Sequence, residues 1–212
     1  MQVVITGASR GIGANLAQQY RNVGINVIGT SRNGGPQLHP LDVTDSAAIG
    51  ALAQTITTPV DLLVCNAGVF LDRPLSLGET YDDAIWADSF ATNVTGVFQT
   101  VHHFLPKLAP NAKIAIISSQ MGSSERANGS SYVYRASKSA ALNLGRNLAV
   151  DLAPKGIAVG IYHPGWVITD MGGANAAITP EVSAAGLIER FAALSLETTG
   201  VFEAYDGAPM PF

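Results

Sequence analysis

Short apolar runs alternate with amphipathic segments along the chain. The first run, Gln2–Thr6, is rich in β-branched residues and ends in glycines, which is typical of a strand. After it, Ile12, Leu16, Tyr20 and Val23 recur at helical spacing. The start of the chain is therefore predicted to form a strand, a glycine-rich loop and a helix.

The same alternation continues to the end of the sequence. Apolar runs predict further strands at Asn26–Thr30, Asp61–Cys65, Lys113–Ser118, Ile157–His163 and Gly200–Tyr205. Helical spacing predicts a helix around Ile49–Ile56 capped by Thr44 or Asp45, a long helix from Phe90 to Leu108, one over about Tyr134–Ala153, and one capped by Thr179. The stretch "SRNGGPQLHP" is rich in helix breakers, so the helix expected after the second strand is missing or vestigial.

Strands separated by helices of this length indicate right-handed crossovers. The predicted fold class is α/β, a doubly wound parallel sheet of the Rossmann type in three layers. At 212 residues the chain is expected to form a single domain, 1–212, with the catalytic site built into it.

Composition narrows the range of partners. Charged residues make up only 13% of the chain against 47% hydrophobic, which suggests that another subunit covers part of the surface. A net charge of −4 gives no reason to expect nucleic acid or an anionic membrane. No apolar run approaches the roughly 18 residues of a membrane span, and the start "MQVVITG" lacks the basic residues of a secretory signal, so a cytoplasmic location is expected. With a single cysteine and no His/Cys cluster, neither a disulfide nor a metal site is predicted.

In a doubly wound sheet, ligands bind beyond the carboxyl ends of the strands. After the first strand, Gly7, Gly11 and Gly13 allow a tight turn, a close approach to a pyrophosphate and close packing of the next helix. The spacing G-x-x-x-G-x-G differs from the usual dinucleotide fingerprint and resembles that of the short-chain dehydrogenases/reductases.

Motifs after the other strands extend the resemblance to this family. "CNAG" (65–68) is similar to its Asn-Asn-Ala-Gly turn, "NVTG" (93–96) to its helix asparagine motif, "ISSQMG" to its serine segment, "YRASK" (134–138) to its Tyr-x-x-x-Lys motif, and "HPGWVITDM" to its Pro-Gly segment. The match runs from Val3 to Met171. The helix string "YVYRASKSAALNL" is most similar to small carbonyl-reductase-like members related to the C-signal proteins.

The residues also carry a chemical argument. Reducing a carbonyl requires a proton for the oxygen, and a phenol of pKa about 10 releases its proton readily only beside a cation. Tyr134 and Lys138 share a helix face at i and i+4, so Lys138 is the candidate cation. The resemblance implies that Ser119 holds the substrate oxygen, and that Asn93 kinks its helix and fixes a water linking Lys138 to solvent. Ser118 is the fallback for the serine, and by itself Ser119 also fits a strand-end cap.

The residues after the second strand bear on the cofactor. An acidic residue there would favour NAD, but the sequence reads "GTSRN", and Arg32 favours NADP. Arg10 in the glycine turn is a second candidate for the 2′-phosphate, although both arginines also fit solvated surface positions. The predicted cofactor-binding residues are Gly7, Ser9, Arg10, Gly11, Ile12, Gly13, Ser31, Arg32, Asp42, Val43, Asn66, Ala67, Gly68, Tyr134, Lys138, Pro164, Gly165, Val167 and Thr169.

The predicted function is NADPH-dependent reduction of a ketone or aldehyde, reversible as alcohol oxidation. Phe70, Met121, Trp166 and Met171 are candidate apolar wall residues, although core packing explains them equally well. An NADP-binding signalling or scaffold protein with incidental turnover is the alternative. Apolar residues on the helices near Phe90–Leu108 and Tyr134–Leu152 predict a homodimer or homotetramer.

Overall fold

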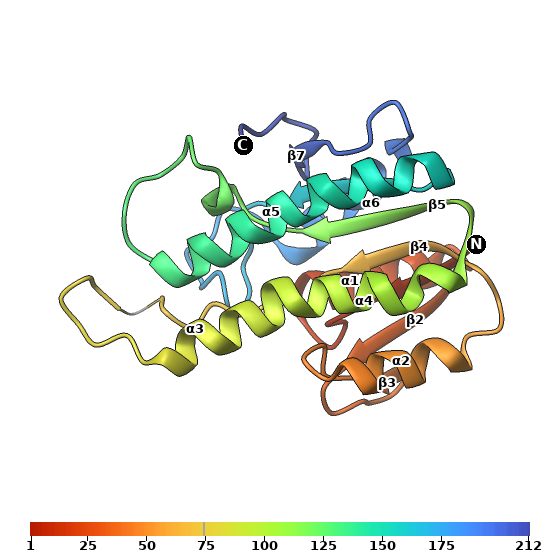
Figure 1. The fold of residues 1–212 in the computed structure, drawn as a ribbon, viewed down its shortest axis with the longest axis horizontal. Helices are drawn as coiled ribbons and strands as arrows, with labels where there is room; N and C mark the ends of the chain where they lie inside the picture. The colour runs from red at the N-terminus through yellow and green to blue at the C-terminus, as the bar shows by residue number, and fades with distance from the viewer. Residues whose placement is uncertain (74) are drawn as a thin grey trace.

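A parallel β-sheet forms the centre of the protein in the computed structural model, which describes residues 1–73 and 75–212 (Figure 1). Its strands are β1 (Gln2–Ile5), β2 (Asn26–Ser31), β3 (Leu38–Pro40), β4 (Val60–Cys65), β5 (Leu108–Ile117), β6 (Ala158–His163) and β7 (Phe202–Ala204). The strand order is β3-β2-β1-β4-β5-β6-β7, and every neighbouring pair is parallel. The order reverses between β1 and β4, which places the switch point of the sheet beside the glycine-rich turn.

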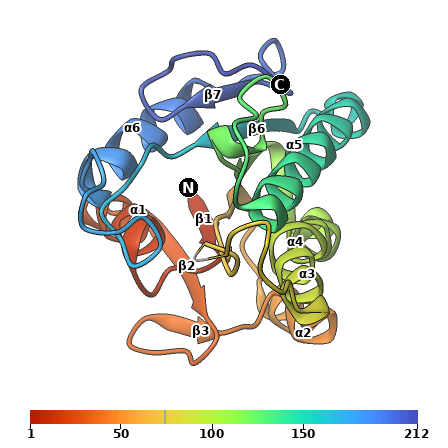
Figure 2. The ribbon, with the colours of Figure 1, turned by 90° about the vertical axis from the view of Figure 1, so that its left-hand side faces the viewer.

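Helices cover both faces of this sheet, as Figure 2 shows looking onto the carboxyl ends of the strands. One layer holds α1 (Gly11–Asn22) and α6 (Pro180–Ala193), and the other holds α2 (Ser46–Thr55), α4 (Gly96–Phe104) and α5 (Tyr132–Leu152). Helix α3 (Asp83–Phe90) leads into α4. The predicted doubly wound, three-layered α/β fold is confirmed.

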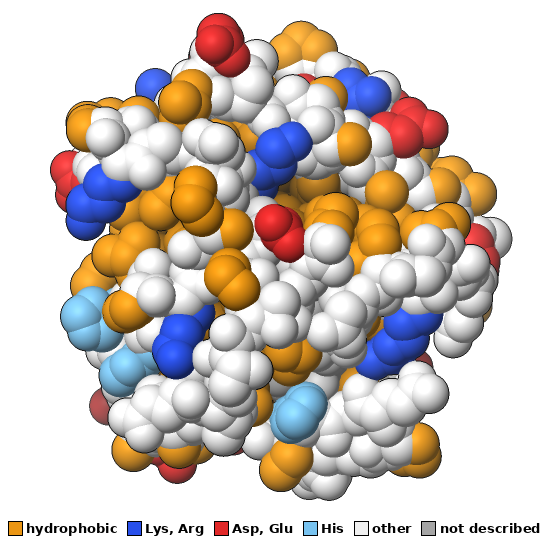
Figure 3. Space-filling model, turned by 90° about the vertical axis from the view of Figure 1, so that its right-hand side faces the viewer, with side chains coloured by type: hydrophobic (Ala, Val, Ile, Leu, Met, Phe, Trp, Pro, Cys, Tyr) orange, Lys and Arg blue, Asp and Glu red, His pale blue; other side chains and the backbone are white. Residues whose placement is uncertain are grey.

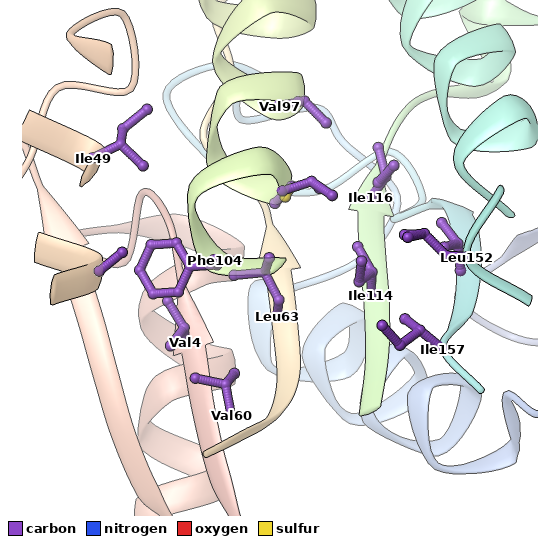
Figure 4. Packing of buried hydrophobic residues seen from close by; sticks show 14 of the residues in the cluster. Val4, Ile49, Val60, Leu63, Val97, Phe104, Ile114, Ile116, Leu152 and Ile157 are labelled. Carbon is purple, nitrogen blue, oxygen red and sulfur yellow. The ribbon is translucent and has the colours of Figure 1, made fainter. Parts of the chain in front are cut away.

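Two hydrophobic clusters hold the layers together. On the α2, α4 and α5 face, Phe104 packs among β-strand residues such as Val4, Leu63 and Ile114 (Figure 4). On the α1 and α6 face, the cluster includes Leu16, Leu187 and Phe191. The strands are buried on both sides, which explains why their sequences are continuously apolar rather than alternating.

Helix α5 lies very close to the sheet at Gly145. A Cβ at this position would lie 2.5 Å from Cγ1 of Ile161 on β6. The missing side chain allows the approach, and it sets the depth at which α5 holds Tyr134 and Lys138.

The long helix predicted from Phe90 to Leu108 needs correction. The chain is already helical from Asp83, where α3 begins. It then passes through a π-helical segment, Ala91–Thr95, and α4 ends at Phe104. Leu108 instead begins β5. The apolar periodicity continues through Leu105 because a short 3-10 turn, Leu105–Lys107, keeps that side chain against the core.

Strand β2 is followed by a turn and then by β3. All residues between them are described, and they form no helix, as the helix-breaking residues of this stretch predict. Strand β3 itself was not predicted, since its three residues "LHP" lie inside the breaker-rich stretch. Of the two predicted caps for α2, the structure uses Asp45. Thr179 caps α6 with Pro180 at the first helical position, as predicted.

The face opposite the carboxyl ends of the strands carries interspersed basic, acidic and hydrophobic side chains (Figure 3). Charges of one sign do not gather on that face. No helix within the described part of the chain is long and apolar enough to cross a membrane.

The α2 cap gives a stability prediction. Asp45 Oδ1 accepts a hydrogen bond from the Ala48 amide at 3.0 Å. Asp45→Ala should destabilise the protein by about 1 kcal/mol, because a first-turn amide loses its acceptor. Thermal unfolding should shift down by roughly 2 to 4 °C. Asp45→Ser keeps an acceptor oxygen and serves as the control, so an equal loss in both variants would contradict the capping role.

Candidate active site

The glycine-rich turn after β1 is shaped by close backbone approaches. Gly7 and Gly11 have φ angles of +69° and +55°. A Cβ on Gly13 would lie 2.2 Å from the Gly7 carbonyl oxygen. Asn66, after β4, fixes the turn by donating from Nδ2 to the carbonyl oxygens of Thr6 and Gly7, both at 3.0 Å. The turn is therefore held in place by Asn66 and has no room for a side chain at Gly7 or Gly13.

The glycine-rich turn leads directly into the amino terminus of α1. The N-cap residue, Arg10, makes no side-chain capping hydrogen bond, and the first turn of α1 carries no acidic residue. Helix amino termini present amide donors and partial positive charge to anions. The cradle fits the pyrophosphate of a dinucleotide.

Tyr134 and Lys138 lie one turn apart on α5, and both are buried. Lys138 Nζ is 5.7 Å from the centre of the Tyr134 ring and donates to the Ile117 carbonyl oxygen at 3.0 Å. Burial lowers the pKa of the Lys138 ammonium to about 8. Burial also raises the pKa of Tyr134 to about 12, and a hydrogen bond with Ser119 acts in the opposite direction.

Desolvation is the largest influence on the pKa of the Tyr134 phenol in the structure. The Lys138 ammonium lies over the Tyr134 ring and donates to the Ile117 carbonyl oxygen. Burial favours the neutral form of the Tyr134 phenol.

The two serines after β5 take different positions. Ser119 lies against the Tyr134 side chain, and its Oγ also accepts from the Met121 amide at 3.1 Å. Ser118 Oγ donates to the Lys138 carbonyl oxygen at 3.0 Å and so ties β5 to α5. Ser119 is the serine that faces the phenol. The same residue also caps the 3-10 turn Gln120–Gly122.

Asn93 lies in the π-helical segment and is buried. Its Oδ1 accepts from the Val69 amide, and its Nδ2 donates to the Val69 carbonyl oxygen, all at 2.9 Å. Nδ2 also lies 3.0 Å from Ser137 Oγ on α5. A Cβ on Gly68 would contact both Asn93 Oδ1, at 3.2 Å, and Lys138 Nζ, at 3.3 Å. Asn93 and Lys138 thus flank the same glycine.

The residues predicted to choose the cofactor lie after β2 and β3. Ser31 is buried and donates from Oγ to the Gly34 carbonyl oxygen at 2.8 Å. Hydrogen bonds from Thr44 hold the pKa of Asp42 below its usual value, and the nearby Arg32 guanidinium adds to this effect. Arg10 forms an exposed ion pair with Asp170 at 2.6 Å. The two predicted phosphate-binding arginines therefore face different carboxylates.

The segment after β6 packs against the glycine-rich turn. Gly165 has a φ of +88°, and a Cβ on Gly11 would lie 3.1 Å from Thr169 Cγ2. Arg73, from the segment after β4, donates to the carbonyl oxygens of Met171 and Gly172. The remaining predicted cofactor-binding residues, on the segments that follow β1, β3, β4 and β6, are Ser9, Ile12, Val43, Ala67, Pro164 and Val167.

Sequence reasoning missed Asp72 and Arg73 and placed Phe70 only as a wall residue. The Phe70 ring stacks on Tyr134 with centroids 4.1 Å apart and planes at 13°. Asp72 is fully buried and accepts hydrogen bonds from the first turn of α5. The only available signal was a lone acidic residue in a loop, which usually indicates solvent exposure.

Cys65, which replaces the first asparagine of the family turn, is buried at the end of β4. Burial raises the pKa of its thiol to about 12, so at neutral pH it is a protonated, apolar-packed side chain.

Comparison with known proteins decides the family. Residues 1–178 match the family model described as short chain dehydrogenase. The chain belongs to the short-chain dehydrogenase family. The predicted resemblance is thereby confirmed.

Three similar proteins place the chain within this short-chain dehydrogenase family. C-signal of Myxococcus xanthus is 38% identical over 160 residues, covering 74% of this chain and 95% of C-signal. An NADPH-bound carbonyl reductase from chicken fatty liver has 28% identity and a TM-score of 0.90, covering 100% of this chain and 98% of its own. The carbonyl reductase Sniffer of D. melanogaster has 26% identity and a TM-score of 0.91, covering 100% of this chain and 99% of its own.

Proposed function

We propose that this short-chain dehydrogenase reduces the carbonyl of a ketone or aldehyde with NADPH, reversibly, with Tyr134 as the proton donor. The observation that carries the proposal is the convergence of Ser119, Tyr134, Lys138 and Asn93 beside the glycine-rich cradle. The NADPH-bound chicken carbonyl reductase, similar over the whole chain, supports the same chemistry.

NADPH, when bound, supplies the hydride for the carbonyl carbon. The cradle formed by Gly7, Gly11 and Gly13 would hold its pyrophosphate at the amino terminus of α1. Tyr134 holds a proton on its phenol oxygen and donates it to the substrate oxygen as negative charge develops there. Ser119, which already lies against the phenol, orients the same oxygen by hydrogen bonding.

Lys138 and Asn93 act behind the phenol. The buried ammonium stabilises the phenolate that remains after proton transfer, because opposite charges interact strongly where water is excluded. Asn93, on the other side of Gly68, fixes Val69 and Ser137 around the ammonium. In the proposal, a water held near Asn93 and Lys138 returns the proton to Tyr134.

The direct test is NADPH oxidation measured across a panel of ketones and aldehydes of moderate size. Steady turnover with at least one member supports the proposal. The similarity to C-signal favours a second candidate, an NADP-binding signalling protein with incidental turnover. NADPH binding without turnover on the whole panel would favour that candidate instead.

The acid can be tested with a matched pair on one helix. Tyr134→Phe keeps the ring that stacks on Phe70 but removes the proton, so kcat should fall by at least about 100-fold. NADPH affinity, measured by fluorescence titration, should stay within a few-fold of wild type. Tyr132→Phe, two residues earlier and exposed, is the control and should keep wild-type activity. Turnover in Tyr134→Phe within a few-fold of wild type would exclude Tyr134 as the acid.

The pH dependence follows from Lys138. Its pKa of about 8 means that the ammonium is charged below pH 8 and neutral above it, whereas Tyr134, at about 12, stays protonated. We expect kcat/KM for reduction to be level near pH 6 to 7 and to fall above pH 8, approaching about 10-fold per pH unit. A profile that remains level to pH 10 would contradict this role of Lys138.

Arg32 provides the test of cofactor choice. Ser31 is a poor position for an introduced carboxylate, since its hydroxyl must donate to Gly34. Arg32→Ala should instead lower the preference for NADPH over NADH by about 10-fold, through loss of a charge-assisted contact of about 1.4 kcal/mol. Lys155→Ala, which removes an equal charge after α5, is the control for long-range electrostatics. An unchanged preference in Arg32→Ala would remove Arg32 from the cofactor site.

The proposed assembly is a homodimer or homotetramer packed through the helices near Phe90–Leu108 and Tyr134–Leu152. Large apolar side chains are exposed on these helices, including Phe98 at 43% and Val150 at 74%. Burying such side chains against a second copy is favourable. Light scattering at micromolar concentration should give the mass of two or four chains, and a monomer mass would remove the proposal.

A further inference from the structure

Helix α5 begins in an unusual way. Its N-cap residue, Ser131, is left-handed with φ of +50°, and Ser130 before it has φ of +59°. Serine usually caps a helix from an extended conformation by accepting from a first-turn amide. Ser131 makes no such side-chain bond. The helix that carries Tyr134 therefore lacks its local cap.

Asp72 supplies that cap from a distant part of the chain. One carboxylate oxygen accepts from the Val133 amide at 2.7 Å, and the other accepts from the Tyr134 amide at 3.2 Å. Asp72 comes from the segment after β4, which lies beside the start of α5 (Figures 1 and 2). One of the two bonds is thus made to the backbone of Tyr134 itself.

The environment of Asp72 makes this contact strong and specific. The side chain is fully buried, and no Lys or Arg forms an ion pair with it among the described residues. A buried carboxylate requires hydrogen bonds from donors nearby. Here the two amides and the positive end of the α5 dipole provide the compensation. Moving α5 away from Asp72 would leave a buried charge without partners.

The same short segment also grips the Tyr134 side chain. Phe70, two residues before Asp72, stacks flat on the Tyr134 ring at 4.1 Å. Arg73, the next residue, donates hydrogen bonds to the carbonyl oxygens of Met171 and Gly172 on the segment after β6. The backbone of Tyr134 and its ring are therefore fixed by residues only two positions apart in sequence.

We propose that Asp72 is a positioning residue for Tyr134, which sets the distance between the phenol and the bound carbonyl by capping α5 from outside the helix. This inference rests on the proposed function, because the position of the phenol matters to turnover only if Tyr134 donates the proton. A displacement of about 1 Å in a reacting group can cost about 100-fold in rate.

The test compares Asp72→Asn and Asp72→Ala with Asp82→Ala. Asp82 is the matched control, since it caps α3 through the Ala84 amide at 3.0 Å and contacts no proposed catalytic residue. Asp72→Asn keeps the shape of the side chain and one acceptor oxygen. If Asp72→Ala fails to fold, Asp72→Asn alone tests the positioning role.

Amide hydrogen exchange tests the cap without relying on activity. In the wild type, the Val133 and Tyr134 amides should exchange at least about 10-fold more slowly than expected for an uncapped first turn. This protection should fall in both Asp72 variants and remain unchanged in Asp82→Ala. Wild-type amides that exchange as fast as an uncapped helix end would overturn the proposal.

Kinetics then test the consequence for the phenol. In the Asp72 variants, kcat should fall by about 10-fold to 100-fold with a smaller change in KM. NADPH affinity should remain within about 3-fold, because the cradle lies on other segments. A kcat equal to that of Asp82→Ala would overturn the positioning role.

The two proposals fail in different ways. If Tyr134→Phe is inactive but the Asp72 variants keep full turnover, only the positioning role is wrong. If Tyr134→Phe keeps full turnover, the proposed function is wrong. The positioning role is then wrong as well, even if amide hydrogen exchange shows that Asp72 caps α5.

Discussion

The burial of one ammonium group constrains the rest of the site. Lys138 Nζ lies at the end of β5 and donates to the Ile117 carbonyl oxygen, so the last residue of a core strand holds the charge. This contact requires α5 to lie deep against the sheet. Gly122 allows it on one side, since a Cβ there would lie 2.7 Å from the Lys138 carbonyl carbon, and Gly145 allows it further along the helix. The position of the charge therefore depends on core packing as much as on polar contacts.

The segments that follow the strands at the candidate site are tied together by contacts between loops rather than by secondary structure. Arg10 joins the glycine-rich turn to Asp170, and Arg73 joins the segment after β4 to the segment after β6. The Arg10 pair is exposed, and exposed ion pairs typically contribute at most about 1 kcal/mol. Such contacts can be exchanged for contacts with a ligand at little cost. The rigid part of the site lies deeper, at Asn66, Asn93 and Lys138.

The fold and the placement of Tyr134 and Lys138 on one helix follow from the sequence because both depend on local patterns. Apolar runs mark the buried strands, and the spacing of Tyr134 and Lys138 places them on one helix face whatever the tertiary structure. The missed features depend on contacts distant in sequence. Asp72 meets α5 across 61 positions, and β3 is a strand only because β2 offers it a partner. The raised pKa of Tyr134 was likewise not predicted, since it is caused by burial that no spacing reveals.

The π-helical segment Ala91–Thr95 has a consequence for how the chain tolerates change in length. In a π-helix the backbone bond spans five residues instead of four, as from the Gly96 amide to the Ala91 carbonyl oxygen, so the segment holds one residue more than an α-helix needs. Deleting one residue there would restore an unbroken α-helix and remove the wide turn in which Asn93 lies. Asn93 would then leave Val69 and Ser137. The extra residue of the π-helical segment therefore makes the helix less regular, and it serves the polar contacts of Asn93 rather than the apolar core.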